Sequence, residues 1–320
     1  MKKILILTGD PNSINSEILY KTWKTLSKKV KKKVYLVSNY KLIKKQFKIL
    51  GYKIKIENVN NIDELNKTNN LKIINVNLTF KNPFKVKKDE ASRFIFDTFN
   101  LGHKLALDKK KTLGLINCPI NKELLKNKFV GVTEYFANKC NVRKDSEVML
   151  IKNEQLAVSP ITTHINISEI SRCINKEKII NKVKIIDFFF KKNFHIKPKI
   201  AILGLNPHNA ELRKNSEEVK FILPAISKLK KLGIKASGPF VADTIFIDDY
   251  KKFDVIVGMY HDQVIAPFKS LFKFDAINMT LGLKYLRLSP DHGTASDIIL
   301  KKKANPYSLK KCIDTIIDLR

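Results

Sequence analysis

Residues 1–15 read Met-Lys-Lys-Ile-Leu-Ile-Leu-Thr-Gly-Asp-Pro-Asn-Ser-Ile-Asn, an apolar run followed by a loop with one glycine. The run Ile4–Leu7 is shorter than the core of a secretory signal peptide, so it predicts a buried β-strand. The loop lacks the Gly-x-Gly-x-x-Gly spacing of a Rossmann domain, and it also lacks a Walker sequence. The start of the chain therefore predicts an α/β fold of another kind.

Short apolar runs alternate with longer amphipathic stretches along all 320 residues. The runs are rich in β-branched residues and often end at Gly, Asn or Pro, which predicts strands at 4–7, 34–37, 71–76, 112–116, 148–151, 199–203 and 254–259. Helical spacing predicts helices at 16–30, 91–107, 176–192, 217–232 and 308–319, the last with Ser308 as its N-cap. This alternation predicts a mainly parallel sheet covered by helices.

The charge is strongly positive, with 61 Lys and Arg against 30 Asp and Glu and a formal net charge of +31. Only 6 of the basic residues are Arg, whereas bidentate recognition of bases and phosphates favours Arg over Lys. Residues 201–300, where most of the polar motifs below lie, carry a net charge of only +2. A nucleic-acid partner is therefore not expected, and a polyanion-binding protein is kept as the alternative of another class.

Four cysteines are widely spaced, without a Cys-x-x-Cys pair. This spacing favours a reducing cytoplasm over a disulfide framework or a thiolate metal site. No apolar run approaches the ~20 residues of a membrane span, so we expect no membrane partner.

Three histidines follow predicted strand ends: His164, His208 and His261. Ligands of open α/β sheets bind at the carboxyl ends of the strands. Three imidazoles that converge there would form a divalent-metal site with open positions for a substrate. The alternative for each is a structural histidine bonded to a nearby loop carbonyl. A fourth histidine, His292, lies in the polar segment Asp291-His292-Gly293-Thr294.

Carboxylates and isolated cationic groups gather in the same part of the chain. The carboxylates are Glu211, Asp243, Asp262 and Asp291, and the candidate anion-binding groups are Lys269, Asn278 and Arg287. Arg287 is one of few arginines, which suggests a need for planar, bidentate contact with a carboxylate or phosphate. These residues predict a small anionic substrate held by a metal, but they do not reveal the reaction.

An ordered set of motifs resembles one family, that of 4-hydroxythreonine-4-phosphate dehydrogenase, over nearly the whole chain. The matching pieces are Gly9-Asp10-Pro11 with Glu17, Cys118-Pro119-Ile120-Asn121-Lys122, Thr133-Glu134-Tyr135, Thr162-Thr163-His164, Leu205-Asn206-Pro207-His208-Asn209, Gly238-Pro239 with Ala242-Asp243-Thr244, Met259-Tyr260-His261-Asp262-Gln263, Asn278-Met279-Thr280-Leu281-Gly282-Leu283, and Asp291-His292-Gly293-Thr294-Ala295. Single pieces are weak signals, but the ordered set is specific.

The resemblance implies a two-lobed α/β/α fold like that of isocitrate and isopropylmalate dehydrogenases, not a Rossmann domain. It implies one lobe of residues 1–127 plus the C-terminal segment and a second of residues 128–285. It also implies a homodimer with a shared active site.

The resemblance further implies the roles of individual residues. The metal, which could be Zn, Mg, Co or Mn, would bind His164, His208 and His261, with His261 donated by the partner subunit. The substrate would bind Thr133, Lys269, Asn278 and Arg287, and the catalytic residues would be Asp243, Asp262 and Lys269. Asp291, His292 and Gly293 would lie close to NAD, with NADP as the alternative cofactor.

The implied reaction oxidises 4-phosphohydroxy-L-threonine, and the resulting oxo acid decarboxylates to 3-amino-2-oxopropyl phosphate during pyridoxine 5'-phosphate biosynthesis. The sequence departs from the family pattern in three places, which bear on the identity of the substrate. Val132 replaces a histidine, the first loop at 12–16 lacks extra glycines, and residues 298–301 lack a glycine. Because valine cannot form a side-chain hydrogen bond, a 4-phosphoerythronate-like hydroxy acid is the alternative substrate.

Overall fold

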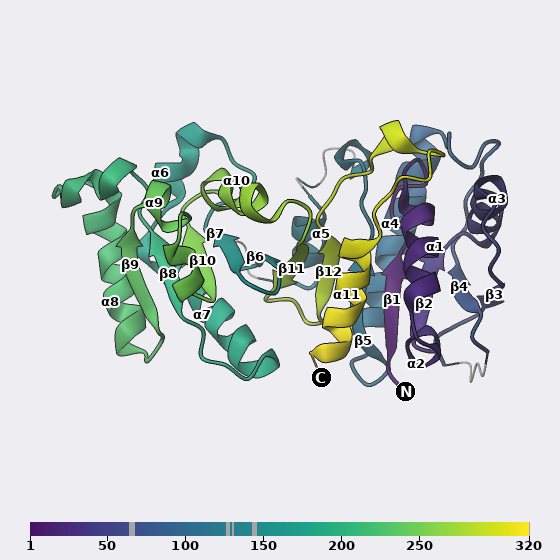
Figure 1. Ribbon diagram of the computed structural model, residues 1–320, viewed down its shortest axis with the longest axis horizontal. Coiled ribbons are helices and arrows are strands. Elements are labelled where there is room, and N and C mark those ends of the chain that lie inside the picture. The colour runs from purple at the N-terminus through teal and green to yellow at the C-terminus, as the bar shows by residue number, and fades with distance from the viewer. Residues whose placement is uncertain (64–67, 126–128, 130, 143–145, 320) are drawn as a thin grey trace. The chain divides into compact units, whose positions relative to one another are not determined.

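The computed structural model describes residues 1–63, 68–125, 129, 131–142 and 146–319, and these form two compact units (Figure 1). Unit 1 contains Met1–Lys139 and Lys284–Asp318, and unit 2 contains Cys140–Leu283 together with Leu319. The sequence placed the lobe boundaries near residues 127 and 285. In the structure, unit 1 continues beyond residue 127 through the helix α5 (Val132–Lys139).

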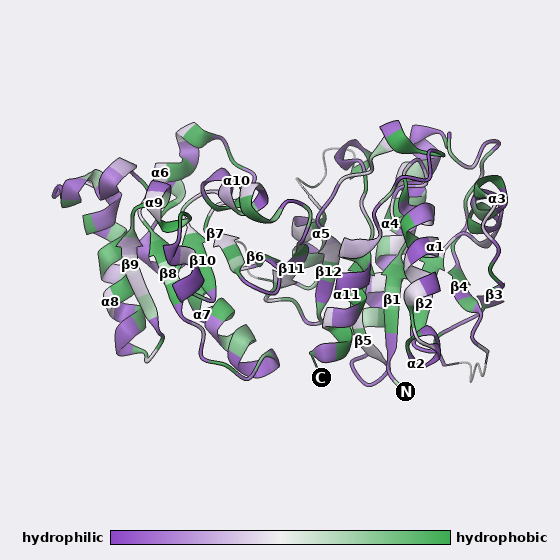
Figure 2. Cartoon of the chain, in the orientation of Figure 1, coloured by the Kyte–Doolittle hydropathy of each residue, from purple (hydrophilic) through white to green (hydrophobic). Residues whose placement is uncertain are grey.

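Unit 1 is built on a parallel sheet with the strand order β3-β4-β2-β1-β5-β12. Its strands are β1 (Lys3–Leu7), β2 (Val34–Ser38), β3 (Ile56–Val59), β4 (Leu71–Asn75), β5 (Thr112–Asn117) and β12 (Arg287–Pro290). Its other helices are α1 (Asn15–Thr25), α2 (Lys28–Lys31), α3 (Tyr40–Leu50), α4 (Lys88–Ala106) and α11 (Tyr307–Asp318). Figure 2 shows the central strands as apolar, in agreement with the complete burial of Ile4 and Leu5.

Two glycines show how helices cover both faces of this sheet. Gly102 of α4 lies against the side chains of Leu7 and Leu115, whereas Gly114 of β5 lies against Ile316 of α11. Successive residues of a strand point to opposite faces, so α4 and α11 pack on opposite sides of β5.

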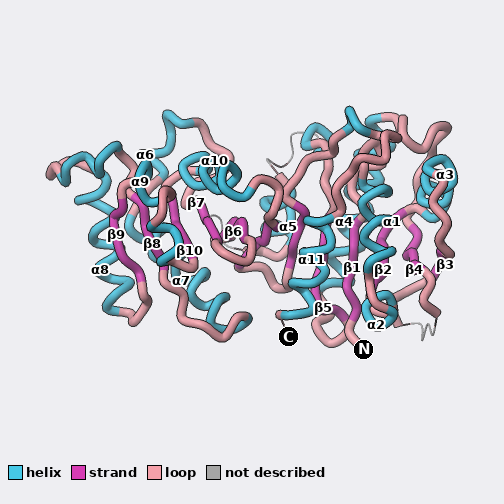
Figure 3. Tube along the Cα trace, viewed as in Figure 1, coloured by secondary structure: helices cyan, strands magenta, loops and turns pink. Residues whose placement is uncertain are grey.

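Unit 2 has the strand order β11-β6-β7-β10-β8-β9. Its strands are β6 (Val148–Lys152), β7 (Ala157–Pro160), β8 (Ile200–Leu203), β9 (Ala236–Phe240), β10 (Val255–Gly258) and β11 (Ile277–Leu281). Strand β6 is antiparallel to both neighbours, and the β7-β10-β8-β9 portion is parallel. The α-helices are α6 (Ile170–Cys173), α7 (Lys176–Asn193), α8 (Leu223–Lys231), α9 (Ala242–Ile245) and α10 (His261–Phe272), as Figure 3 shows.

The predicted α/β class is confirmed, with local corrections. The helix predicted at 16–30 breaks at Leu26, which is extended, and Ser27 then caps α2 by accepting from the Val30 amide. The predicted N-cap role of Ser308 is wrong. Helix α11 begins one residue earlier, and the Ser308 hydroxyl instead accepts a hydrogen bond from the Asp291 amide at 3.0 Å.

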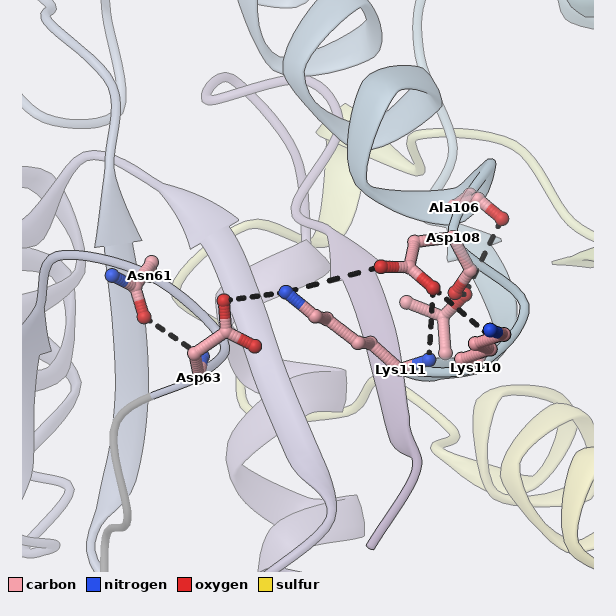
Figure 4. A network of polar contacts seen from close by, with 7 residues as sticks. Asn61, Asp63, Ala106, Asp108, Lys110 and Lys111 are labelled. Carbon is pink, nitrogen blue, oxygen red and sulfur yellow. Dashed lines mark hydrogen bonds and ion pairs between the residues drawn. The ribbon is translucent and has the colours of Figure 1, made fainter.

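A surface network fixes the turn between α4 and β5 (Figure 4). The Asp108 carboxylate accepts from the amides of Lys110 and Lys111 at 3.0 and 3.2 Å. The Lys111 ammonium lies 2.8 Å from the Asp63 carboxylate and 3.9 Å from that of Asp108. Lys111 thus ties the start of β5 to the segment that follows β3.

None of the helices in the described part of the chain has both the length and the apolarity to cross a membrane.

Candidate active site

Within unit 2, the three predicted metal ligands lie just beyond the carboxyl ends of three adjacent strands. His164 follows β7, His208 follows β8, and His261 begins α10 directly after β10. The rings of His164 and His261 are neighbours, with centroids 5.9 Å apart. The structure therefore brings together two of the three imidazoles whose convergence the sequence predicts.

Asp262 orients the imidazole of His261. Its Oδ1 lies 2.6 Å from the Nδ1 atom of His261, which leaves Nε2 available to a ligand. A carboxylate on the second ring nitrogen is the usual partner of a metal-ligating histidine, because it fixes the tautomer and the ring orientation.

His208 lies in an unusual stretch of backbone. Five consecutive residues, His208–Leu212, have positive φ values between 46° and 56°, and none of them is glycine. Left-handed backbone costs roughly 1–2 kcal/mol for each such residue, so the surrounding structure must hold this turn. The Asn209 side chain does so in part, by donating to the Pro239 carbonyl at 3.0 Å.

A buried carboxylate holds the segment just before this turn. Glu218 is fully buried, and its Oε1 accepts from the amides of Leu205 and Asn206 at 2.8 and 2.9 Å. Burial alone would raise the pKa of Glu218, but hydrogen bonds from the Asn206 amide, the Asn206 side chain and the Leu205 amide lower it. Glu218 is therefore an ionised anchor, and its place in a helix-like sequence gave no sign of this role.

The chemistry of the donors fits a divalent metal, because neutral imidazoles are common ligands of such ions. In the described ranges, no three His, Cys, Asp or Glu side chains are grouped so that they alone could hold a metal ion.

The remaining predicted residues of unit 2 differ in their surroundings. Asp243 is exposed on α9, and Lys269 is exposed on α10. Asn278 is half-buried on β11, and its buried Oδ1 atom has no hydrogen-bond partner among the described residues. A buried acceptor of this kind is costly unless a ligand or water completes it.

Within unit 1, Arg287 of β12 is 2% exposed and forms a polar cluster with Thr133 of α5. Its Nε donates to Asn117 Oδ1 at 2.7 Å, and its Nη1 donates to Thr133 Oγ1 at 3.2 Å. Its guanidinium lies 5.8 Å from the centre of the Phe136 ring. Burial lowers the pKa of Arg287 to about 10, so the side chain stays cationic at neutral pH. The structure thus joins two predicted substrate-binding residues and adds Asn117, which the sequence analysis missed.

The first loop of unit 1 is held by side chains. Asn12 donates to the Val86 carbonyl at 2.9 Å and accepts from the Val86 amide at 2.7 Å. Asn15 donates to the Pro119 carbonyl at 2.8 Å. A Cβ atom at Gly9, whose φ is 68°, would collide with that same carbonyl. Side-chain hydrogen bonds of two asparagines therefore hold this loop, which contains the single glycine Gly9.

The predicted cofactor loop follows β12. Its Asp291 amide is held by Ser308, and the Thr294 carbonyl accepts from the Ile14 amide at 3.2 Å. His292 Nδ1 lies 2.8 Å from the Gly293 carbonyl oxygen. Apart from Gly293 itself and its two chain neighbours, no described residue has an atom within 4 Å of the position that a Cβ would take at Gly293. The loop is thus anchored at both ends and leaves space for a ligand beside Gly293.

The sequence matches the family profile of the pyridoxal phosphate biosynthetic protein PdxA over residues 29–316. The chain belongs to the PdxA family. A 4-hydroxythreonine-4-phosphate dehydrogenase from Sulfurihydrogenibium sp. (strain YO3AOP1) is 37% identical over 325 residues, covering 100% of this chain and 99% of that protein. These findings confirm the predicted family and the prediction of an oxidoreductase with a role in pyridoxal phosphate biosynthesis.

Solved structures support the same conclusion. The 4-hydroxythreonine-4-phosphate dehydrogenase of Klebsiella pneumoniae has a TM-score of 0.85 and 26% identity, covering 100% of this PdxA-family chain and 99% of that chain. Isocitrate dehydrogenase from Methylococcus capsulatus has a TM-score of 0.50 and 12% identity, covering 99% of this chain and 85% of that one. The second likeness concerns the fold alone, and it confirms the predicted isocitrate-dehydrogenase-like architecture.

Proposed function

We propose that this chain oxidises 4-phosphohydroxy-L-threonine with NAD, assisted by a divalent metal. The 2-amino-3-oxo acid formed would lose carbon dioxide and yield 3-amino-2-oxopropyl phosphate for pyridoxine 5'-phosphate biosynthesis. The observation that carries the proposal is the placement of His164, His208 and His261 after the carboxyl ends of the adjacent strands β7, β8 and β10 of unit 2. The family's named activity, with full coverage of the Sulfurihydrogenibium relative, supports the choice of substrate.

The residues of unit 2 would hold the metal and the reacting end of the substrate. His164, His208 and His261 would be the metal ligands, and Asp262 would keep His261 in the tautomer whose Nε2 is free. When bound there, a divalent metal supplies Lewis-acid polarisation of the substrate hydroxyl. Asn278 would place its buried acceptor on a substrate donor, since that atom lacks a partner among the described residues. Asp243 and Lys269 would handle protons from their exposed positions.

The residues of unit 1 would bind the charged groups of the reactants. Arg287, aligned by Asn117 and Thr133, would bind an anionic group of the substrate through guanidinium N–H groups. Asp291, His292 and Gly293 would hold NAD, which would supply the hydride acceptor for the carbinol carbon. The hydroxyl proton would go to a base. The carboxylate would then leave as carbon dioxide, and the electron pair left on the α-carbon would take up a proton.

We also propose a homodimer in the cytoplasm, with His261 completing the metal site of the partner subunit. This part of the proposal rests on the membership of the chain in the PdxA family. NADP remains the alternative cofactor, because nothing in the described loop selects between the two.

The test is a spectroscopic assay of NADH formation from 4-phosphohydroxy-L-threonine, with Zn²⁺, Mg²⁺, Co²⁺ or Mn²⁺ supplied after chelator treatment. Turnover that a chelator abolishes and metal restores is the expected result. No turnover with any of these metals would refute the proposal. Tight, salt-dependent binding of DNA without turnover would instead favour the polyanion-binding alternative.

Val132 motivates a second candidate substrate. It occupies the first position of α5, beside Thr133, and replaces a hydrogen-bonding histidine of the family with a hydrocarbon. A related 4-phosphoerythronate-like acid is therefore the alternative. A comparison of kcat/KM for the two acids, measured side by side, decides between them.

A further inference from the structure

One chain of hydrogen bonds joins the loops that carry the three candidate metal ligands. Its central link is Gln263, which lies two residues after His261 and is 9% exposed. The Oε1 atom of Gln263 accepts from the Met259 amide at 2.6 Å. Its Nε2 atom donates to the Gly204 carbonyl at 2.7 Å. A single carboxamide therefore connects the loop before His261 to the loop that leads to His208.

Thr162 extends this chain to the third loop. It lies two residues before His164, and its hydroxyl donates to the Met259 carbonyl at 2.7 Å. The Thr162 amide donates to the same carbonyl at 3.1 Å. Both polar groups of the Met259 backbone are therefore occupied, the amide by Gln263 and the carbonyl by Thr162.

The chemistry of the central link requires a carboxamide. The Met259 amide needs an acceptor and the Gly204 carbonyl needs a donor, and among side chains of this length only glutamine offers both without a charge. Gly258 leaves room for it, because a Cβ there would lie 2.9 Å from Gln263 Oε1. On the other side, Glu218 accepts from the amides of Leu205 and Asn206. The segment from Gly204 to Asn206 is thus held by Gln263 and Glu218 together.

We propose that Gln263 is a positioning residue, which sets the spacing of the loops that present His164, His208 and His261 to the metal. This inference rests on the proposed function, because it takes these histidines to be metal ligands. The hydrogen bonds act within one chain. They therefore position each ligand whether it serves its own subunit or the partner.

The test is the Gln263→Met variant, which keeps the length and volume of the side chain and removes both hydrogen bonds. The matched control is Gln46→Met in unit 1. Gln46 is 2% exposed, and its Nε2 donates to the carbonyls of Pro11 and Pro83 at 2.9 and 2.7 Å. The readouts are the Kd for Co²⁺, from absorption titration of metal-free protein without substrate, and the Tm of the metal-free protein.

Gln263→Met should raise the Kd for Co²⁺ by about tenfold to a hundredfold, as the loss of outer partners of metal ligands does. Gln46→Met should leave that Kd within about twofold of wild type, although both variants lower the Tm. Equal Kd values for the two variants would overturn the proposal and leave Gln263 a purely structural residue. Failure of the wild-type protein to bind Co²⁺ would instead show that the proposed metal site itself is wrong.

A milder variant tests the same chain of hydrogen bonds if Gln263→Met does not fold. Thr162→Val removes the hydroxyl that binds the Met259 carbonyl and keeps the shape of the side chain. It should raise the Kd for Co²⁺ by a smaller factor than the increase of about tenfold to a hundredfold that is expected for Gln263→Met. A Kd equal to that of wild type would overturn the proposed coupling between these loops.

Discussion

Replacing Arg287 with lysine tests how the buried cation of unit 1 works. Arg287→Lys keeps the positive charge but replaces a planar fork by a single ammonium. One ammonium cannot reproduce the bonds from Nε to Asn117 at 2.7 Å and from Nη1 to Thr133 at 3.2 Å while also facing a substrate anion. At about 1.5–3 kcal/mol for a hydrogen bond from a charged donor, the loss of one of the two bonds should lower the free energy of unfolding by about 2 kcal/mol.

The effect on catalysis should be larger, because a charged contact to the substrate is also weakened. A hydrogen bond to a charged group contributes about 1.5–3 kcal/mol, which corresponds to a fall in kcat/KM of roughly 10- to 150-fold. Urea unfolding and steady-state kinetics measure the two effects. Arg93→Lys is the control, because Arg93 is exposed and pairs only weakly with Glu90 at 3.3 Å. Arg287→Lys with the stability and kcat/KM of wild type would refute this account of the guanidinium.

Two further predictions concern other parts of the chain. Lys72 is fully buried on β4, and burial together with the nearby charge of Lys3 lowers its pKa to about 8. Between pH 8 and 10.5 the unfolded chain therefore binds more protons than the folded chain. The free energy of unfolding should rise by about 2 kcal/mol as the pH increases across that range, allowing for solvent screening. Urea unfolding at several pH values measures this rise, and Lys72→Met should abolish it; a rise of equal size in the variant would contradict the assignment. His208→Ala should abolish Co²⁺ binding and activity while circular dichroism stays native, and turnover at the wild-type rate would show that His208 is not a ligand.

The strands of the core were predictable because a strand that is buried on both faces consists of consecutive apolar residues, a pattern visible in the sequence. The runs at 4–7 and 34–37 became β1 and β2, since consecutive β-branched and aliphatic residues suit a strand covered on both sides. Strand β9 was missed because Gly238 and Pro239 resemble a turn, and β12 because Arg287 interrupts its apolar pattern. In both strands the partners across the sheet outweigh local propensity.

The candidate site, like the sheet, has features that the sequence predicted and features that only the tertiary structure revealed. The sequence by itself predicted which groups would carry the chemistry, because three imidazoles follow strand ends, where parallel strands collect ligands, and carboxylates and a rare arginine lie in the same part of the chain. Only the tertiary structure revealed how they are held. The left-handed turn at His208, the buried Glu218 anchor and the Gln263 link all depend on hydrogen bonds between segments far apart in the chain. Such contacts leave no periodic pattern in the sequence, because they depend on the packing of the whole unit and not on the residues next to each group along the chain.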